Sequence, residues 1–334
     1  MDIPNYTKQL IENKSDYVLT PEDIKTIQHE GIKKYIFQKL NSSKYKASAI
    51  TPDYVQKVQD KIDLCVNHNS PIYITLPFGA TKNPYLPTAP GIDWAEMFNL
   101  AYIREYLKPI AKAYTNGVIL EYISVAVFEE KVNRISQTDT DLYDQQFQKL
   151  IEFYQQYLPQ NFTLKYSRVS DHIPRDIIER QLEIKKSELR KTWDQQSTEV
   201  KEYKLLKAKR NLIYDPIDQY ANDYILDSAL GHDAFCSECW TLDAAPWDKK
   251  NMITLGHNYT QGWAIHVRST YGSSVNFWSG IGVLNRQSDR IVPTVLSAQQ
   301  YEGVKKNITQ EKIPLRFDTA LTNLRELPIN QISD

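Results

Sequence analysis

The chain of 334 residues is poor in three features that define common protein classes: cysteine, glycine and long apolar runs. Three cysteines argue against a disulfide framework and favour a reducing compartment. Eleven glycines exclude a collagen or a glycine-rich cofactor cradle. No apolar run approaches the roughly 18 residues of a membrane helix, and the first residues show no basic segment followed by an apolar one. We therefore expect a cytoplasmic protein that does not associate with membranes.

The chain also lacks a net charge of either sign, because 40 Lys and Arg residues oppose 41 Asp and Glu residues. No global electrostatic field would recruit a nucleic acid. Hydrophobic residues make up 41% of the chain, which excludes a fully disordered protein of this length. A rough prior of about 150 residues per domain predicts two domains, or one large α/β domain with an insertion.

Several catalytic motifs are absent. There is no G-x-G-x-x-G fingerprint, no Walker loop and no G-x-S-x-G elbow, so the sequence supports neither a dinucleotide enzyme nor a serine hydrolase. His232, Cys236 and Cys239 form an H-x3-C-x2-C pattern, but a structural zinc site needs four ligands and no second pair exists. We expect no metal and no cofactor, and we interpret His232 with Asp233 as a polar pair of a binding site.

The pattern of apolar residues predicts an α/β protein. Thr20 and Pro21 open a helical region in which Gly31 marks a break. Apolar β-rich runs begin near residues 71 and 118 and flank a helix that starts at residue 93, which makes a βαβ unit with parallel strands. We predict a Rossmann-like, mostly parallel sheet flanked by helices, with a charged helical insertion and a β-rich C-terminal portion. The expected segments are N-terminal helices (1–66), a first Rossmann-like half (67–172), the insertion (173–231) and a C-terminal half that completes the same domain (232–334).

The loop after the first predicted strand is the first candidate site. Open parallel sheets bind ligands beyond the carboxyl ends of their strands, and Phe78, Gly79 and Lys82 stand at that position. Lys82 could bind a carboxylate or a phosphate, and Gly79 permits a close approach of the backbone. The alternative is an ordinary loop with a solvated lysine.

Glu96 and Glu121 allow two interpretations each. Asp93 and Glu96 form a capping-box pattern at the start of a helix, and Glu96 could instead orient a substrate amine. Glu121 lies inside the second predicted strand, where a buried carboxylate needs a partner and is either structural or functional.

A late β-rich segment supplies the remaining candidates. His266 and Arg268 are two residues apart, so they share one face of a strand. Arg268 suits a carboxylate or phosphate, and His266 is a candidate acid or base near neutral pH. Trp278 could form a wall of a side-chain pocket. A strand with one polar face toward solvent is the alternative.

Two blocks of the sequence resemble the isocyanide (isonitrile) synthases of the pyoverdine/dityrosine biosynthesis superfamily. They are ITLPFGATKNPYLPTAPGIDWAEMFNLAYIREYLKPIAKAY and WAIHVRSTYGSSVNFWSGIGVL, in the family's order. The resemblance implies a Rossmann-like transferase or synthase of secondary metabolism. Such an enzyme converts an amino acid into an isonitrile with a pentose phosphate as carbon donor, often beside an iron/2-oxoglutarate oxygenase. By position it implies that Lys82, Glu96, His266 and Arg268 line the site. The family's K-V-L-G element is absent, and RIVPTVL stands in place of its W-x-T-P-W-H segment.

A second interpretation keeps the fold and changes the substrate. Residues 185–210 carry nine basic and four acidic side chains, a local positive charge that suits contact with phosphates. An aminoacyl-tRNA-dependent cyclodipeptide synthase, including the arginine-using type, has such a basic helix in outline. The candidate tRNA-binding residues are Lys185, Lys186, Arg190, Lys204, Lys207 and Arg210. A third interpretation is a non-catalytic protein that binds a small ligand.

Overall fold

The computed structural model describes residues 3–12, 17–212, 222–236, 245–257, 263–287, 290–311 and 329–333. Its centre is a five-stranded parallel sheet in the order β3-β2-β1-β4-β5. The strands are β1 (Ile72–Phe78), β2 (Val118–Ser124), β3 (Phe162–Arg168), β4 (Met252–Gly256) and β5 (Ile265–His266). The predicted α/β class with a mostly parallel sheet is confirmed.

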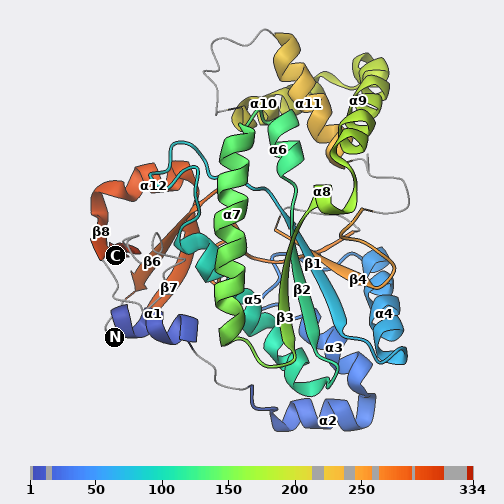
Figure 1. Cartoon of the computed structure of the whole chain (residues 1–334), viewed down its shortest axis with the longest axis vertical. Helices are drawn as coiled ribbons and strands as arrows, with labels where there is room; N and C mark the ends of the chain where they lie inside the picture. Colours follow the sequence, from blue (N-terminus) through green and yellow to red (C-terminus); the bar gives the residue numbers. More distant parts are fainter. Residues whose placement is uncertain are drawn as a thin grey trace.

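Helices flank this sheet (Figure 1). The N-terminal helices are α1 (Ile3–Glu12), α2 (Pro21–Glu30), α3 (Ile32–Leu40) and α4 (Pro52–Asn67). The helices that connect the strands are α5 (Trp94–Ala113), α6 (Ala126–Val132), α7 (Gln137–Tyr154) and α8 (Val169–His172). The predicted break at Gly31 is confirmed, because this glycine separates α2 from α3 with φ +86°, a backbone conformation that disfavours other residues.

The charged insertion consists of helices that extend beyond the carboxyl edge of the sheet, at the top of Figure 1. They are α9 (Arg175–Thr192), α10 (Thr198–Asn211) and α11 (Asn222–Cys236). A 3-10 turn at Trp193–Gln195 separates α9 from α10, and its Trp193 packs in an apolar cluster with Ala208 and Leu230.

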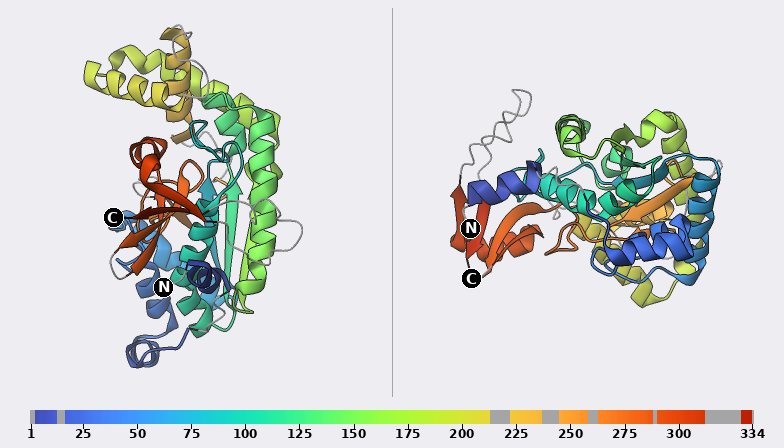
Figure 2. Two further views of the ribbon diagram at one scale, coloured as in Figure 1. Left: turned by 90° about the vertical axis from the view of Figure 1, so that its left-hand side faces the viewer. Right: turned by 90° about the horizontal axis from the view of Figure 1, so that it is seen from below.

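The C-terminal strands divide between two sheets. β4 and β5 extend the parallel sheet, whereas β6 (Ile281–Gln287), β7 (Arg290–Leu296), β8 (Ile308–Glu311) and β9 (Ile329–Ser333) form a second sheet in the order β7-β6-β9-β8. The second sheet lies beside the first one (Figure 2, left), and the short helix α12 (Ala298–Val304) belongs to the same region. The β-rich C-terminal portion is therefore confirmed, as a separate sheet.

The main core lies between the parallel sheet and its helices. Helix α5 is its centre, since most of its residues are buried, among them Phe98, Tyr102 and Tyr106. The predicted capping box is confirmed at its start: Asp93 accepts a hydrogen bond from the Ala95 amide, and Glu96 accepts one from the Asp93 amide. No helix in the described part of the chain is long and apolar enough to cross a membrane.

Candidate active site

The strand order identifies one point where the chain direction across the sheet reverses. β1 lies between β2 and β4, so the connections after β1 and after β4 lead to opposite sides of the sheet. Ligands of open parallel sheets bind beyond the carboxyl ends of the strands at this point. The first residues after β1 and β4 are Gly79 and His257, so the two segments that reach the site are 178 residues apart in the sequence.

Aromatic rings pack beneath this point. The ring of Phe78, the last residue of β1, lies 5.1 Å from that of Phe147, 5.8 Å from that of Phe277 and 6.3 Å from that of Trp278. Phe277 and Trp278 meet edge to face at 5.1 Å. Both are buried, with 6% of the surface of Trp278 exposed. The aromatic wall expected around Trp278 therefore lies next to Phe78, at the predicted edge of the sheet.

A chain of buried polar groups crosses the same region. The Tyr122 hydroxyl donates to the Asn99 side-chain oxygen at 2.9 Å, and the Asn99 nitrogen lies 3.2 Å from Nε2 of His257. Nδ1 of His257 lies 3.1 Å from the Val267 carbonyl. Burial lowers the pKa of His257 to about 4, so the imidazole is neutral, donates from Nδ1 and accepts at Nε2. Both ring nitrogens are thus occupied by the protein, which favours a structural role.

The closest approach at the site is that of Glu129 and Trp278 to Gly79. A Cβ atom on Gly79 would overlap Oε1 of Glu129, and it would lie 2.6 Å from Nε1 of Trp278. Glu129 stands on α6, the first helix after β2. Among the residues that the structure describes, neither Oε1 of Glu129 nor the indole nitrogen of Trp278 has a hydrogen-bond partner. An acceptor and a donor therefore lie side by side against the backbone of Gly79, where only a glycine fits.

Sequence reasoning missed both Glu129 and the structural role of His257. The available signal was position: Glu129 follows the second strand closely, and His257 follows the strand Met252–Gly256 directly. Both positions are on the carboxyl edge, where ligand sites lie.

Lys82 and Glu96 come together, but inside the protein. The Lys82 ammonium is fully buried, lies 2.7 Å from Glu96 and 3.4 Å from Asp93, and donates to the carbonyls of Phe277 and Gly280. Burial raises the pKa of Glu96 to about 7, opposed by Lys82. Lys82 thus connects the start of α5 to the turn that carries Trp278. This arrangement differs from the sequence expectation of a lysine open to a substrate anion.

Glu121 lies in the middle of β2 rather than at its end. Its carboxylate accepts hydrogen bonds from the Tyr73 hydroxyl at 2.7 Å and the Ser167 hydroxyl at 2.6 Å. It also contributes to a surface pocket of about 490 Å³ lined by residues of α7 and β3. Of the two roles left open by the sequence, these hydrogen bonds favour the structural one.

His266 and Arg268 share one face of the chain, and Ile265 and Val267 are buried on the other, as the alternation predicts. The polar side chains contact an N-terminal segment. His266 lies 3.1 Å from the Ser48 hydroxyl and 3.0 Å from the His257 carbonyl, and the Arg268 guanidinium lies 3.5 Å from the carbonyl of Lys44. The sequence gives no sign of this segment, which pairs with the chain at Val267.

His232 lies on α11, in the insertion. Its Nε2 is 2.9 Å from Oδ1 of Asn133 and 2.7 Å from Nδ2 of Asn211. Burial lowers the pKa of His232 to about 4. Cys239 lies outside the described residues, as does the side chain of Cys236, so the structure does not describe the H-x3-C-x2-C pattern as a group. Within the described residues, no three His, Cys, Asp or Glu side chains are grouped as metal ligands.

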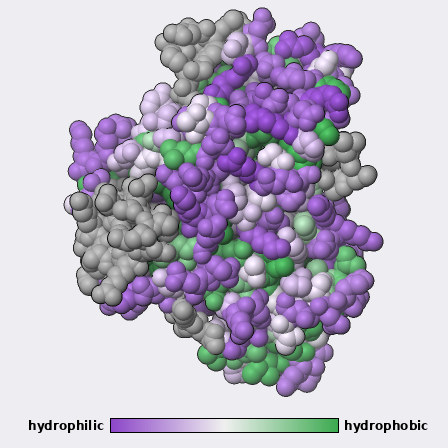
Figure 3. Space-filling model, in the orientation of Figure 1, coloured by the Kyte–Doolittle hydropathy of each residue, from purple (hydrophilic) through white to green (hydrophobic). Residues whose placement is uncertain are grey.

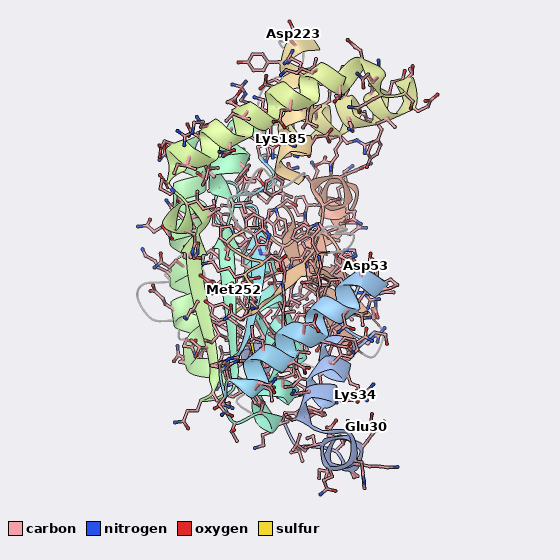
Figure 4. All side chains as sticks on the ribbon, turned by 90° about the vertical axis from the view of Figure 1, so that its right-hand side faces the viewer. Glu30, Lys34, Asp53, Lys185, Asp223 and Met252 are labelled. Carbon is pink, nitrogen blue, oxygen red and sulfur yellow. The ribbon has the colours of Figure 1, made fainter. Side chains whose placement is uncertain are left out.

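Four of the six candidate tRNA-binding residues of the insertion are paired with carboxylates. Figure 4 places Lys185 and Asp223 in the part of the molecule formed by the insertion, and the face over it is mainly hydrophilic (Figure 3). The pairs are Lys185 with Glu188, Lys186 with Glu183 and Asp227, Arg190 with Asp227, and Lys204 with Asp233. Lys207 and Arg210 are exposed and make no ion pair with a described residue. The pairing reduces the positive charge offered to a phosphate backbone.

Comparison with known proteins identifies a structural relative. No family model matches the sequence, and no curated protein matches it at a significant level. The structure is similar to the crystal structure of the PvcA protein from Pseudomonas aeruginosa, with a TM-score of 0.63 and 14% sequence identity. The similarity covers 90% of this chain and 99% of that chain. At this identity the two proteins are shown to share a fold across nearly their whole lengths.

Proposed function

We propose that the chain is a biosynthetic enzyme that acts on an amino acid, in the manner of isocyanide synthases, at the carboxyl edge of β1 and β4. The observation that carries this proposal is the fold shared with PvcA, which supports the distant resemblance of the two sequence blocks to that family. The facing groups of Glu129 and Trp278 beside Gly79 supply a polar, aromatic-walled position where such a substrate would bind. The expected reaction class is a synthase or transferase reaction at the substrate nitrogen.

The test is mass spectrometry of metabolites from cells that express the chain, followed by the purified protein with single amino acids and a pentose phosphate. An isonitrile derived from one amino acid is the expected product. A cyclic dipeptide formed from aminoacyl-tRNA would select the tRNA-dependent interpretation instead. Absence of any new compound under both conditions would favour a ligand-binding protein.

A matched pair of glycine variants links the product to the site. Gly79→Ala introduces a Cβ atom where Glu129 and Trp278 approach, so it should reduce product formation at least tenfold. Gly303→Ala adds the same atom where nothing lies within 4 Å, so its product yield should equal that of the unmodified chain. Equal yields from the two variants would place the site elsewhere.

A further inference from the structure

Glu129 is connected to the helical insertion by a short series of hydrogen bonds. Nδ2 of Asn133, one turn further along the chain, donates to Oε2 of Glu129 at 2.5 Å. Oδ1 of Asn133 lies 2.9 Å from Nε2 of His232, and that nitrogen lies 2.7 Å from Asn211. The series therefore begins at the sheet edge and ends on α10, by way of α11.

The direction of these hydrogen bonds follows from chemistry. A carboxylate only accepts, so Asn133 must turn its NH2 group toward Glu129 and its oxygen toward His232. His232 is neutral because of its burial, and it satisfies that oxygen when Nε2 carries the proton. The amide of Asn211, 2.7 Å from the same nitrogen, then has to turn its oxygen rather than its NH2 group toward His232. His232 thus fixes the amide of Asn133, and Asn133 fixes one oxygen of Glu129. The other oxygen, Oε1, lies against the backbone of Gly79, beside the indole nitrogen of Trp278.

A substrate amino group must lose a proton before its nitrogen can form a bond, since an ammonium ion has no lone pair. The site needs a group that accepts this proton within reach of the substrate. Within the described residues, other acidic groups near the site hold cations: Glu96 and Asp93 hold Lys82, Glu130 pairs with Arg175, and Asp144 holds Arg168 and the Ser124 hydroxyl through Oδ2, while its Oδ1 is buried without a partner. Of these two carboxylate oxygens without a partner among the described residues, Oε1 of Glu129 is the one that lies against the backbone of Gly79 at the sheet edge.

We propose that Glu129 accepts the proton that the substrate's ammonium group loses, and that Asn133 and His232 act as positioning residues that hold its carboxylate in place. The step converts an ammonium and a carboxylate into an amine and a carboxylic acid, with no other reactant. This inference rests on the proposed function, because it requires a substrate that carries an amine.

The electrostatic surroundings of Glu129 agree with this role. Burial raises the pKa of Glu129, and the Asn133 amide opposes the rise, which brings a carboxylic acid toward the range of an effective general base. The charged groups of the elements around it are mainly engaged with one another, and Lys207 faces His232 rather than Glu129. Those pairs are Glu130 with Arg175, Lys131 with Glu179, Arg134 with Asp227, and Lys82 with Glu96 and Asp93.

The first experiment compares Glu129→Gln with Glu130→Gln, its neighbour on the same helix. Glu129→Gln keeps the shape and removes the base, so kcat should fall by about 10²–10⁴-fold with a smaller change in KM. Glu130→Gln should stay within about threefold of the unmodified chain. If the unmodified chain turns over an amino acid and both variants remain equally active, the inference is wrong and the proposed function stands. If the unmodified chain turns over no amine substrate, both are wrong.

The second experiment tests the positioning residues through pH dependence. Asn133→Leu removes the N–H that favours the charged form of Glu129, so the acidic limb of kcat/KM should move to higher pH by about one unit. His232→Ala should move it in the same direction, and His232→Gln, whose amide can still donate to Asn133, should restore it. In protein labelled with ¹³C-glutamate, the carboxyl resonance of Glu129 is the one that Glu129→Gln removes. The pKa from the titration of this resonance should rise in Asn133→Leu and His232→Ala and return in His232→Gln. If these variants lose stability but the acidic limb of kcat/KM stays at the same pH, the residues are structural and the positioning role is wrong.

Discussion

The Lys82 ammonium is surrounded by two carboxylates and two carbonyl groups of its own chain, and no part of the residue is exposed. A buried charge that loses its partners is costly, whereas an exposed pair contributes little. The structure therefore indicates that this lysine contributes strongly to stability. Because it donates to the carbonyls of Phe277 and Gly280, it also holds the turn that carries Trp278 at the site.

Lys82→Met should lower the free energy of unfolding by about 3–5 kcal/mol, because Asp93 and Glu96 remain buried without their cation. The loss should grow above pH 7, where Glu96 has to be buried as an anion. Lys33→Met is the control, since Lys33 and Asp63 form a pair 3.3 Å apart with side chains 40% and 53% exposed; its loss should be below about 1 kcal/mol. Urea unfolding measures both, and equal losses would contradict the structural role of Lys82.

His257 predicts a specific response to acid. Its pKa is about 4 in the folded chain, against an ordinary value near 6.5 when unfolded. Between these values the unfolded chain binds a proton that the folded chain does not, so the free energy of unfolding should fall as the pH falls from 6.5 to 4. The contribution is up to about 3 kcal/mol. His257→Phe should make this dependence shallower, and an imidazole resonance of His257 that titrates near pH 6.5 would contradict the prediction.

At the scale of elements, Asp93 joins the two sheets. One of its carboxylate oxygens accepts from the amide of Ala95 at 2.6 Å and from the amide of Gly282 at 3.0 Å. The same carboxylate therefore caps α5 and fixes the start of β6. This contact requires close approach, because a Cβ atom on Gly282 would lie 2.5 Å from the backbone carbon of Trp94.

Gly282→Ala should lower the free energy of unfolding by about 1–3 kcal/mol, since the atoms in the way belong to backbone and cannot rotate aside. Gly303→Ala on α12 has open space around its Cβ, so it should be neutral or stabilise by up to about 1 kcal/mol. Thermal and chemical unfolding of the two variants give the comparison. A stable Gly282→Ala variant would show that β6 can move away from α5.

The elements that local patterns define could be predicted from the sequence. The caps at Thr20 and Asp93, the break at Gly31 and the buried sides of Ile265 and Val267 all follow from spacing within a few residues. The site could be predicted only in part, because its residues depend on pairing between distant segments. Nothing near residue 79 shows that β4 will pair with β1.

The same limit explains why the roles of single residues were harder to predict than their positions. Lys82 was expected at the strand end and lies there, but the carboxylates that surround it come from the start of α5 and the carbonyls from a turn near residue 280. The partners of His266 come from residues 48 and 257. A sequence pattern predicts on which face of a strand or helix a side chain lies. The tertiary fold determines which distant residues contact that side chain.

At the scale of the whole molecule, α5 connects most of the parts. Arg104 on α5 donates to the carbonyls of Leu10 and Ile11, both at 3.0 Å, which holds α1 in place. Tyr6 on α1 in turn donates to the carbonyl of Ile291 on β7 at 3.1 Å. The parallel sheet, the second sheet and the N-terminal helix are thus linked through one buried helix.

The insertion is built differently, which leads to a prediction about its dynamics. Its apolar cluster, which includes Trp193 and Leu230, is separate from the main core, and Ala208 is the buried residue of α10. Segments with few buried contacts open at a lower free energy than the global unfolding reaction. Amide hydrogen exchange should therefore be fastest in α10 and slowest in α5, with a difference of at least about 100-fold. Mass spectrometry of peptides from the exchanged protein measures both helices in one sample, and equal protection would show that the insertion opens only when the whole molecule unfolds.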